Sequence, residues 1–199
     1  MIYLIFILNI ITQNPATQNR LPVEEEKQLV DRALKGDTAA FEKIVRSYVK
    51  ELGSLAKYYV KSHDAAEDIV QNLFVHLWEK RGTIRIEGTV RTYLYAAIRN
   101  LSLDFLKHQT IDKKYSYRYS QLVPLPSTPH EIAEHRELDI LITQALEKLP
   151  ERRRIVFILN KYFNMTYAEI AEILEISVKT VDAHMVNAVK SLRSYIQSL

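Results

Sequence analysis

The segment that most constrains the fold lies near the C-terminus, where two short helical patterns meet at a tight turn. Thr166 and Glu169 have the three-residue spacing of a capping box, which opens a helix. Leu174 and Ile176 bracket the turn, and Ser177 is placed to cap a second helix. This layout predicts a helix-turn-helix, a unit that inserts its second helix into the DNA major groove. The second helix offers apolar side chains for its buried side at helical spacing: Val178, Val181, Met185, Ala188, Val189 and Leu192.

The composition is that of an ordinary globular chain. Its 199 residues, 47% hydrophobic and 26% charged, suffice for one large or two small domains. The chain has only four glycines and a mostly helical apolar spacing, so we expect an all-α fold. The absence of cysteine excludes disulfides and thiol nucleophiles, and it suits a reducing cytoplasm, where we expect the chain to act.

Charge is unevenly distributed along the chain. The net charge of +3 is weak support for DNA binding by itself. Residues 62–79 hold four acids and no lysine or arginine, whereas residues 81–118 hold eight basic residues against three acidic ones. An acidic helix followed by a basic segment indicates two adjoining surfaces with different partners.

Four segments divide the chain. Residues 1–23 form an apolar extension that is too short to span a bilayer and lacks the basic leader of a secretion signal. An over-extended start and a weak membrane contact both remain open for it. Helical periodicity fills residues 24–110 and 136–199, which we predict to be two all-α domains. Between them, residues 111–135 hold three prolines and are expected to form an extended linker.

Four helices are expected in the first domain. They cover residues 24–34, a stretch that follows Asp37, a stretch capped by Asp64, and residues 89–108. The last of them presents apolar side chains for burial at helical spacing: Leu94, Ala97, Ile98, Leu101 and Phe105.

Three segments of the chain resemble parts of bacterial sigma-70 factors. Residues 64–78, DAAEDIVQNLFVHLW, resemble the helix with which those proteins bind RNA polymerase. Residues 92–104, TYLYAAIRNLSLD, resemble the helix that they use at the −10 promoter element. Residues 149–157, LPERRRIVF, together with the helix-turn-helix, are similar to the domain that reads the −35 element. Order and spacing agree over about residues 24–193, and the short length resembles the extracytoplasmic-function subgroup.

The resemblance implies a fold of two small helical domains, a sigma region 2 bundle and a region 4 helix-turn-helix. It also implies that residues 64–78 dock on the clamp helices of the polymerase β′ subunit. Asp68, Gln71 and Asn72 would supply that contact with hydrogen bonds and charge pairing. On the charge pattern alone, a merely solvated helix face explains the same residues.

For the −10 element, the resemblance implies a loop that holds a flipped base and a helix that carries phosphates and single strand. Arginines supply positive charge, and two tyrosines are candidates for base stacking. The family commonly has tryptophan where this chain has Tyr93, which leaves stacking possible but puts the choice of base in doubt. The candidates are Arg81, Arg85, Arg91, Tyr93, Tyr95 and Arg99.

For the −35 element, the resemblance implies contacts from the exposed side of the second helix of the helix-turn-helix. The candidates are Ser177, Lys179, Thr180, Ala183, His184 and Asn187. The family often has lysine or arginine at Asp182, His184 and Asn187, so we expect low affinity for free DNA. Arg152, Arg153 and Arg154 are candidates for contact with the DNA backbone or the polymerase β flap.

Other classes of function fit less well. His130 and His135 are one residue too far apart for a zincin motif, and no phosphate-binding glycine loop is present. We therefore expect no enzymatic activity, no cofactor, no metal and no small-molecule substrate. The competing hypothesis is a stand-alone LuxR-type regulator, which leaves residues 64–78 and 92–104 unexplained. The subgroup resemblance adds an anti-sigma factor as an expected partner.

Overall fold

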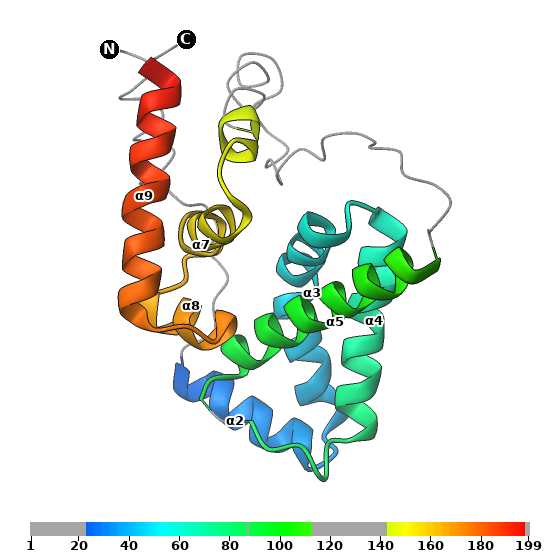
Figure 1. Cartoon of the computed structure of the whole chain (residues 1–199). Helices are drawn as coiled ribbons and strands as arrows, with labels where there is room; N and C mark the ends of the chain where they lie inside the picture. The colour runs from blue at the N-terminus through cyan, green and yellow to red at the C-terminus, as the bar shows by residue number, and fades with distance from the viewer. Residues whose placement is uncertain (1–22, 87, 113–142, 198–199) are drawn as a thin grey trace, which may run out of the picture. The chain divides into compact units, whose positions relative to one another are not determined.

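The computed structural model describes residues 23–86, 88–112 and 143–197. The chain divides into two compact units, an N-terminal and a C-terminal one (Figure 1). Every regular element in the described ranges is an α-helix, which confirms the all-α prediction. Residues 1–22 of the predicted apolar extension and nearly all of the predicted linker lie outside the described residues, as do His130 and His135, whereas Val23 already belongs to the first described helix.

The N-terminal unit is a bundle of helices built around one long central helix. Its elements are α2 (Val23–Leu34), α3 (Thr38–Val60), α4 (His63–Glu79) and α5 (Val90–Asp112). Helix α3 packs against the other three, and α4 also packs against α5. The core lies where α3 meets α5: Leu52, Leu55, Leu94 and Ile98 are fully buried. Because α5 continues to Asp112, this unit extends slightly beyond the predicted end at residue 110.

Side-chain caps explain where two of these helices begin. Asp37 accepts a hydrogen bond from the Ala40 amide (3.1 Å) and caps α3, the helix that was predicted to follow it. Helix α4 begins two residues earlier than predicted, because the cap is Ser62 and not Asp64. The Ser62 hydroxyl accepts from the Ala65 amide at 3.3 Å, which places Asp64 inside the first turn. There its negative charge favours the helix N-terminus without capping it.

The C-terminal unit contains the predicted helix-turn-helix. Residues 143–147 are helical, followed by α7 (Glu151–Lys161), α8 (Tyr167–Leu174) and α9 (Val178–Gln197). The capping box is confirmed: the Glu169 amide donates to the Thr166 hydroxyl (3.2 Å), and the Thr166 amide donates to the Glu169 carboxylate (2.7 Å). Between α8 and α9 the chain turns at Glu175, whose φ of 57° is left-handed. Helix α9 packs on both α7 and α8.

Three residues predicted for the core are exposed instead. Val178 is 49% exposed and Val189 is 38% exposed, because the buried side of α9 is narrower than the apolar pattern suggested. Leu101 of α5 is 37% exposed for a similar reason. The side chains that do bury α9 are Val181, Met185, Ala188 and Leu192.

None of the helices in the described ranges is both long enough and apolar enough to cross a membrane.

Candidate nucleic-acid interface

One polar surface lies on α4. Asp68, Gln71 and Asn72 are all exposed, and they occupy neighbouring positions three and four residues apart on one side of the helix. The opposite side is buried through Ile69 and Leu73. The structure therefore brings the three predicted polymerase-binding residues together on an accessible face.

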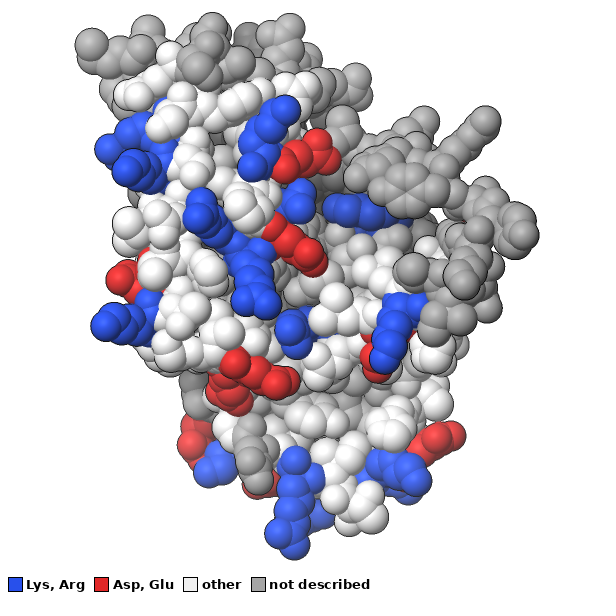
Figure 2. Space-filling model, viewed as in Figure 1, with Lys and Arg blue, Asp and Glu red and all other residues white. Residues whose placement is uncertain are grey.

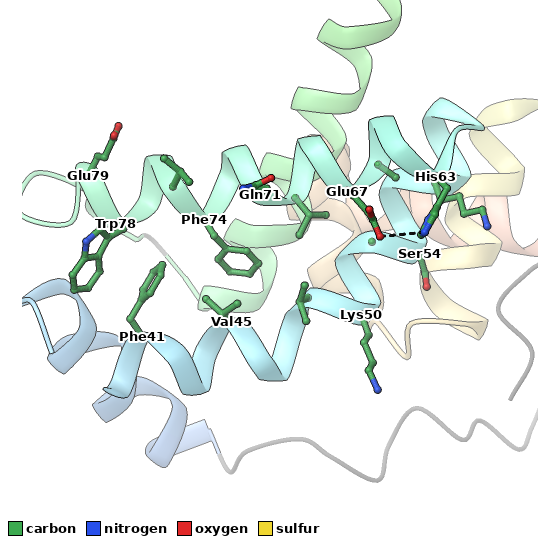
Figure 3. A pocket seen from close by; sticks show the side chains of 16 residues that line it. Phe41, Val45, Lys50, Ser54, His63, Glu67, Gln71, Phe74, Trp78 and Glu79 are labelled. Atoms are coloured by element: carbon green, nitrogen blue, oxygen red, sulfur yellow. Dashed lines mark ion pairs between the residues drawn. The ribbon is translucent and has the colours of Figure 1, made fainter. Parts of the chain in front are cut away.

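An apolar groove runs beside this surface, between α3 and α4 (Figure 3). Its volume is about 990 Å³, and Phe41, Val45, Phe74 and Trp78 line it. Gln71 lies at its rim, so the groove and the polar face of α4 adjoin each other. At the end near the start of α4, His63 forms an ion pair with Glu67 at 3.1 Å: the two side chains line the groove there.

The loop after α4 is anchored by Arg81. Its guanidinium lies over the Trp78 ring, 4.4 Å from the centroid, and Nη1 donates to the Trp78 carbonyl oxygen at 2.6 Å. The Trp78 ring in turn packs against Phe41, with 5.0 Å between centroids. A Cβ atom at Gly36 would lie 3.6 Å from Arg81 Nε, so Arg81 also packs closely on the turn before α3. Arg81 is therefore half-buried and committed to packing, whatever contact it makes with DNA.

Two of the predicted −10 contacts, both in the first turns of α5, are buried in the structure. Tyr95 is completely buried, and its hydroxyl donates to Glu51 Oε2 at 2.5 Å. A ring enclosed in this way cannot stack on a base, so the prediction for Tyr95 is wrong. Arg91 is only 6% exposed, and its guanidinium lies 5.3 Å from the centre of the Tyr95 ring. It therefore belongs to the packing of the bundle and not to a phosphate-binding surface.

The remaining −10 candidates are accessible. Arg85 is exposed in the loop before α5, and Tyr93 and Arg99 are half-exposed on α5 itself. Arg99 Nη1 donates to Asn100 Oδ1 at 2.9 Å. Thr89 caps α5 by accepting from the Thr92 amide at 3.1 Å, so the loop ends at a defined point.

Two tyrosine–glutamate pairs tie the bundle together under this surface. Besides Tyr95 and Glu51, the Tyr48 hydroxyl donates to the Glu26 carboxylate, which joins α3 to α2. Burial raises the pKa of both phenols well above the usual tyrosine range, and the negative charge of each glutamate raises it further. Sequence reasoning missed both pairs, because the partners lie 22 and 44 residues apart and share no local pattern.

The outer face of α9 is the second surface. Lys179, Ala183 and Asn187 are exposed, on the side opposite the buried residues. Ser177 caps α9 by accepting from the Thr180 amide at 3.1 Å, and the hydroxyls of Ser177 and Thr180 are 2.8 Å apart. The structure thus brings together five of the six predicted −35 residues around the N-terminal half of α9.

Two of the six −35 candidates need qualification. His184 is half-buried on the flank of α9, away from the centre of its exposed face. Asn187 is exposed, but its Nδ2 donates to the Ala183 carbonyl oxygen at 2.8 Å. A bidentate pair with adenine therefore requires the Asn187 side chain to turn away from its own helix.

Basic side chains are distributed over this unit among a few acids. Arg152 is exposed at the start of α7, whereas Arg153 and Arg154 are half-buried there. Lysines and arginines recur over α7 and along α9 on the face shown in Figure 2. Such a pattern suits contact with phosphates without making the chain strongly basic.

Fold and surfaces together define a DNA-binding protein of two helical units, in which one unit carries a helix-turn-helix and the other a separate polar docking face. Comparison with known families identifies both units. Residues 44–110 match the family description "Sigma-70 region 2", and residues 139–192 match "Sigma-70, region 4".

Individual relatives agree with the family matches. The chain is 28% identical over 182 residues to the ECF RNA polymerase sigma factor SigW of Bacillus subtilis, covering 87% of this chain and 97% of the relative. Two solved structures share the fold. One is CnrH in complex with the cytosolic domain of CnrY (TM-score 0.64, 21% identity, 87% of this chain and 97% of that one). The other is sigma factor RpoE with the anti-sigma factor NepR from Bartonella quintana (TM-score 0.62, 19% identity, 79% and 96%).

The chain belongs to the sigma-70 family of RNA polymerase sigma factors, and within it to the extracytoplasmic-function group. It is a transcription initiation factor, which the comparisons favour over the stand-alone LuxR-type regulator.

Proposed function

We propose that the exposed faces of α4 and α9 have separate roles in transcription initiation. Asp68, Gln71 and Asn72 of α4 bind the clamp helices of the core polymerase β′ subunit, and α9 binds the −35 element. The observation that carries this proposal is that both faces are accessible, while the residues opposite them are buried in separate cores. The two faces lie on different units, so a partner bound to the residues of one face does not occupy those of the other.

Fewer residues are accessible for contact with the −10 element than the sequence suggested, because Arg91 and Tyr95 are buried. Arg85, Tyr93 and Arg99 are the accessible candidates for contact with phosphates and an unpaired base. The loop between α4 and α5 is held at Arg81 by Trp78 and at Thr89 by the cap of α5. Both ends of the loop that carries Arg85 are therefore anchored to the bundle.

We propose that the polymerase supplies all of the chemistry, that the chain acts in the cytoplasm, and that Arg152 and its neighbours contact the β flap or the DNA backbone. We also propose an anti-sigma factor as a regulatory partner. Support for that partner comes from the RpoE structure, which shares this fold and contains the anti-sigma factor NepR.

The test measures retention and strand opening of a promoter-pool DNA, with and without bacterial core polymerase. We expect both to require core, because residues 178–187 of α9 hold one lysine, Lys179, beside the carboxylate of Asp182, and free DNA binding should therefore be weak. Tight, specific duplex binding by the chain alone, unchanged by core, would contradict the proposal.

Two variants locate the surfaces. Replacing Asp68 and Gln71 with alanine should weaken binding to core while helical content stays unchanged, because both side chains are exposed. Lys179→Ala should reduce initiation on −35-dependent templates without changing affinity for core. Asp31→Ala, an exposed acid on α2, is the matched control and should change neither quantity.

A further inference from the structure

The centre of the exposed face of α9 is apolar, which is unusual for a surface that binds a polyanion. Val186 is 59% exposed, the highest value for a large apolar side chain in the described residues. Ala183, one turn earlier, is also exposed. Neither residue contributes to the core, which α9 reaches through Val181 and Met185 on its other side.

These two residues belong to a straight stripe along the helix. Lys179, Ala183, Val186 and Lys190 are spaced by four, three and four residues, which aligns them on one side of an α-helix. All four are exposed. The stripe therefore has a cation at each end and methyl groups between them, about 16 Å from end to end along the helix axis.

The charges around the stripe indicate what its centre faces. The two lysines are placed to reach phosphates on either side of a groove, whereas the exposed carboxylate of Asp182 lies next to Val186. A carboxylate in that position would be repelled by the phosphate backbone, but it can accept a hydrogen bond from an amino group of cytosine or adenine. The centre of the stripe thus suits base edges and not the backbone.

From this geometry we propose that Ala183 and Val186 read the 5-methyl group of thymine in the −35 element, and that Val186 determines specificity for thymine there. The major groove shows an apolar group only at thymine, so exposed methyl groups on the inserted helix can select it over cytosine. The inference rests on the proposed function, since it requires α9 to bind the −35 element.

The test removes a single methyl group from DNA. Holoenzyme made with the full chain first selects templates from a library randomised over the −35 region. Each thymine in the selected element is then replaced by uracil, which lacks the methyl but keeps every hydrogen-bonding group. At one thymine we expect binding of the wild-type holoenzyme to fall about fourfold, the effect of withdrawing one buried methyl-sized group from contact.

A variant then identifies the residue. With Val186→Ala, binding to the thymine template should fall, and the thymine-to-uracil difference at that position should shrink toward onefold. Alanine is a better helix former than valine, so the variant keeps α9 intact. Val189→Ala, at an exposed valine beside the stripe, is the matched control and should retain the fourfold difference.

The outcomes separate the inference from the proposed function. If holoenzyme initiates but no uracil substitution matters, or if Val186→Ala weakens both templates equally, thymine recognition by Val186 is refuted and the sigma function stands. If no template in the library supports initiation with core present, the proposed function fails and the inference fails with it.

Discussion

The buried hydroxyl of Tyr95 provides a quantitative test of how α5 is held. In Tyr95→Phe the ring stays in the core, but the hydrogen bond to the Glu51 carboxylate is lost. Hydrogen bonds to charged groups contribute about 1.5–3 kcal/mol. Because Glu51 is half-exposed and water can replace part of the lost contact, we expect the lower end, about 1.5 kcal/mol off the free energy of unfolding.

The chain provides its own probe for this measurement. Trp78 is the only tryptophan, and it lies in the same unit as Tyr95, so its fluorescence during urea unfolding reports on that unit. For a denaturant slope of roughly 2 kcal/mol per molar, the midpoint should fall by roughly 0.7 M. Tyr93→Phe, two residues away and half-exposed, is the control and should shift the midpoint far less. Equal shifts for the two variants would refute a stabilising role for the Tyr95–Glu51 pair.

Three further predictions follow from the described contacts. The pKa values of Tyr48 and Tyr95 are raised in the folded state, so the stabilising contribution of both phenols is complete below about pH 10 and is lost as the pH rises further. The free energy of unfolding, followed by Trp78 fluorescence, should therefore fall above that pH. It should fall less steeply in Tyr95→Phe, which has one titrating phenol fewer. Glu175→Gly should raise the free energy of unfolding of the helix-turn-helix by up to about 1 kcal/mol, because glycine adopts φ near 57° without strain. A lower melting temperature in circular dichroism would contradict this. Asp68→Lys should weaken binding to core polymerase at least tenfold in a titration with fluorescently labelled core. Equal weakening by Asp31→Lys would show that the effect comes from the change in net charge and not from a contact made by Asp68.

Local patterns predicted the elements whose hydrogen bonds are local. The capping box of Thr166 and Glu169 joins residues three apart, so the sequence alone contains both partners. The cap of α4 was harder, because Ser62 and Asp64 are both good capping residues and only the backbone conformation decides between them. The turn at Glu175 was placed correctly although no glycine marks it.

The errors at the candidate site have a common physical cause. Tyrosine and arginine each carry a long apolar part and a polar end, so a sequence pattern does not say whether they face water or the core. For Tyr95 the answer depends on Glu51, which is far away in the sequence and becomes a neighbour only when α3 and α5 pack, and the Arg91 guanidinium lies against the ring of that buried tyrosine. The residue-level assignments on α4 and α9 remain predictions, now with known exposure.

The loop between α4 and α5 is anchored at both ends, and the burial of its side chains determines which of its residues can be exchanged. Trp78 holds Arg81 at one end and Thr89 caps α5 at the other, while Ile84 and Ile86 between them are half-buried against the bundle. A substitution in this loop must therefore keep apolar side chains at positions 84 and 86, whereas Arg85 between them is exposed and can be replaced without loss of packing. A variant that replaces Arg85 alone with the residue of another family member should keep the thermal stability of its host, whereas polar residues at positions 84 and 86 should lower it.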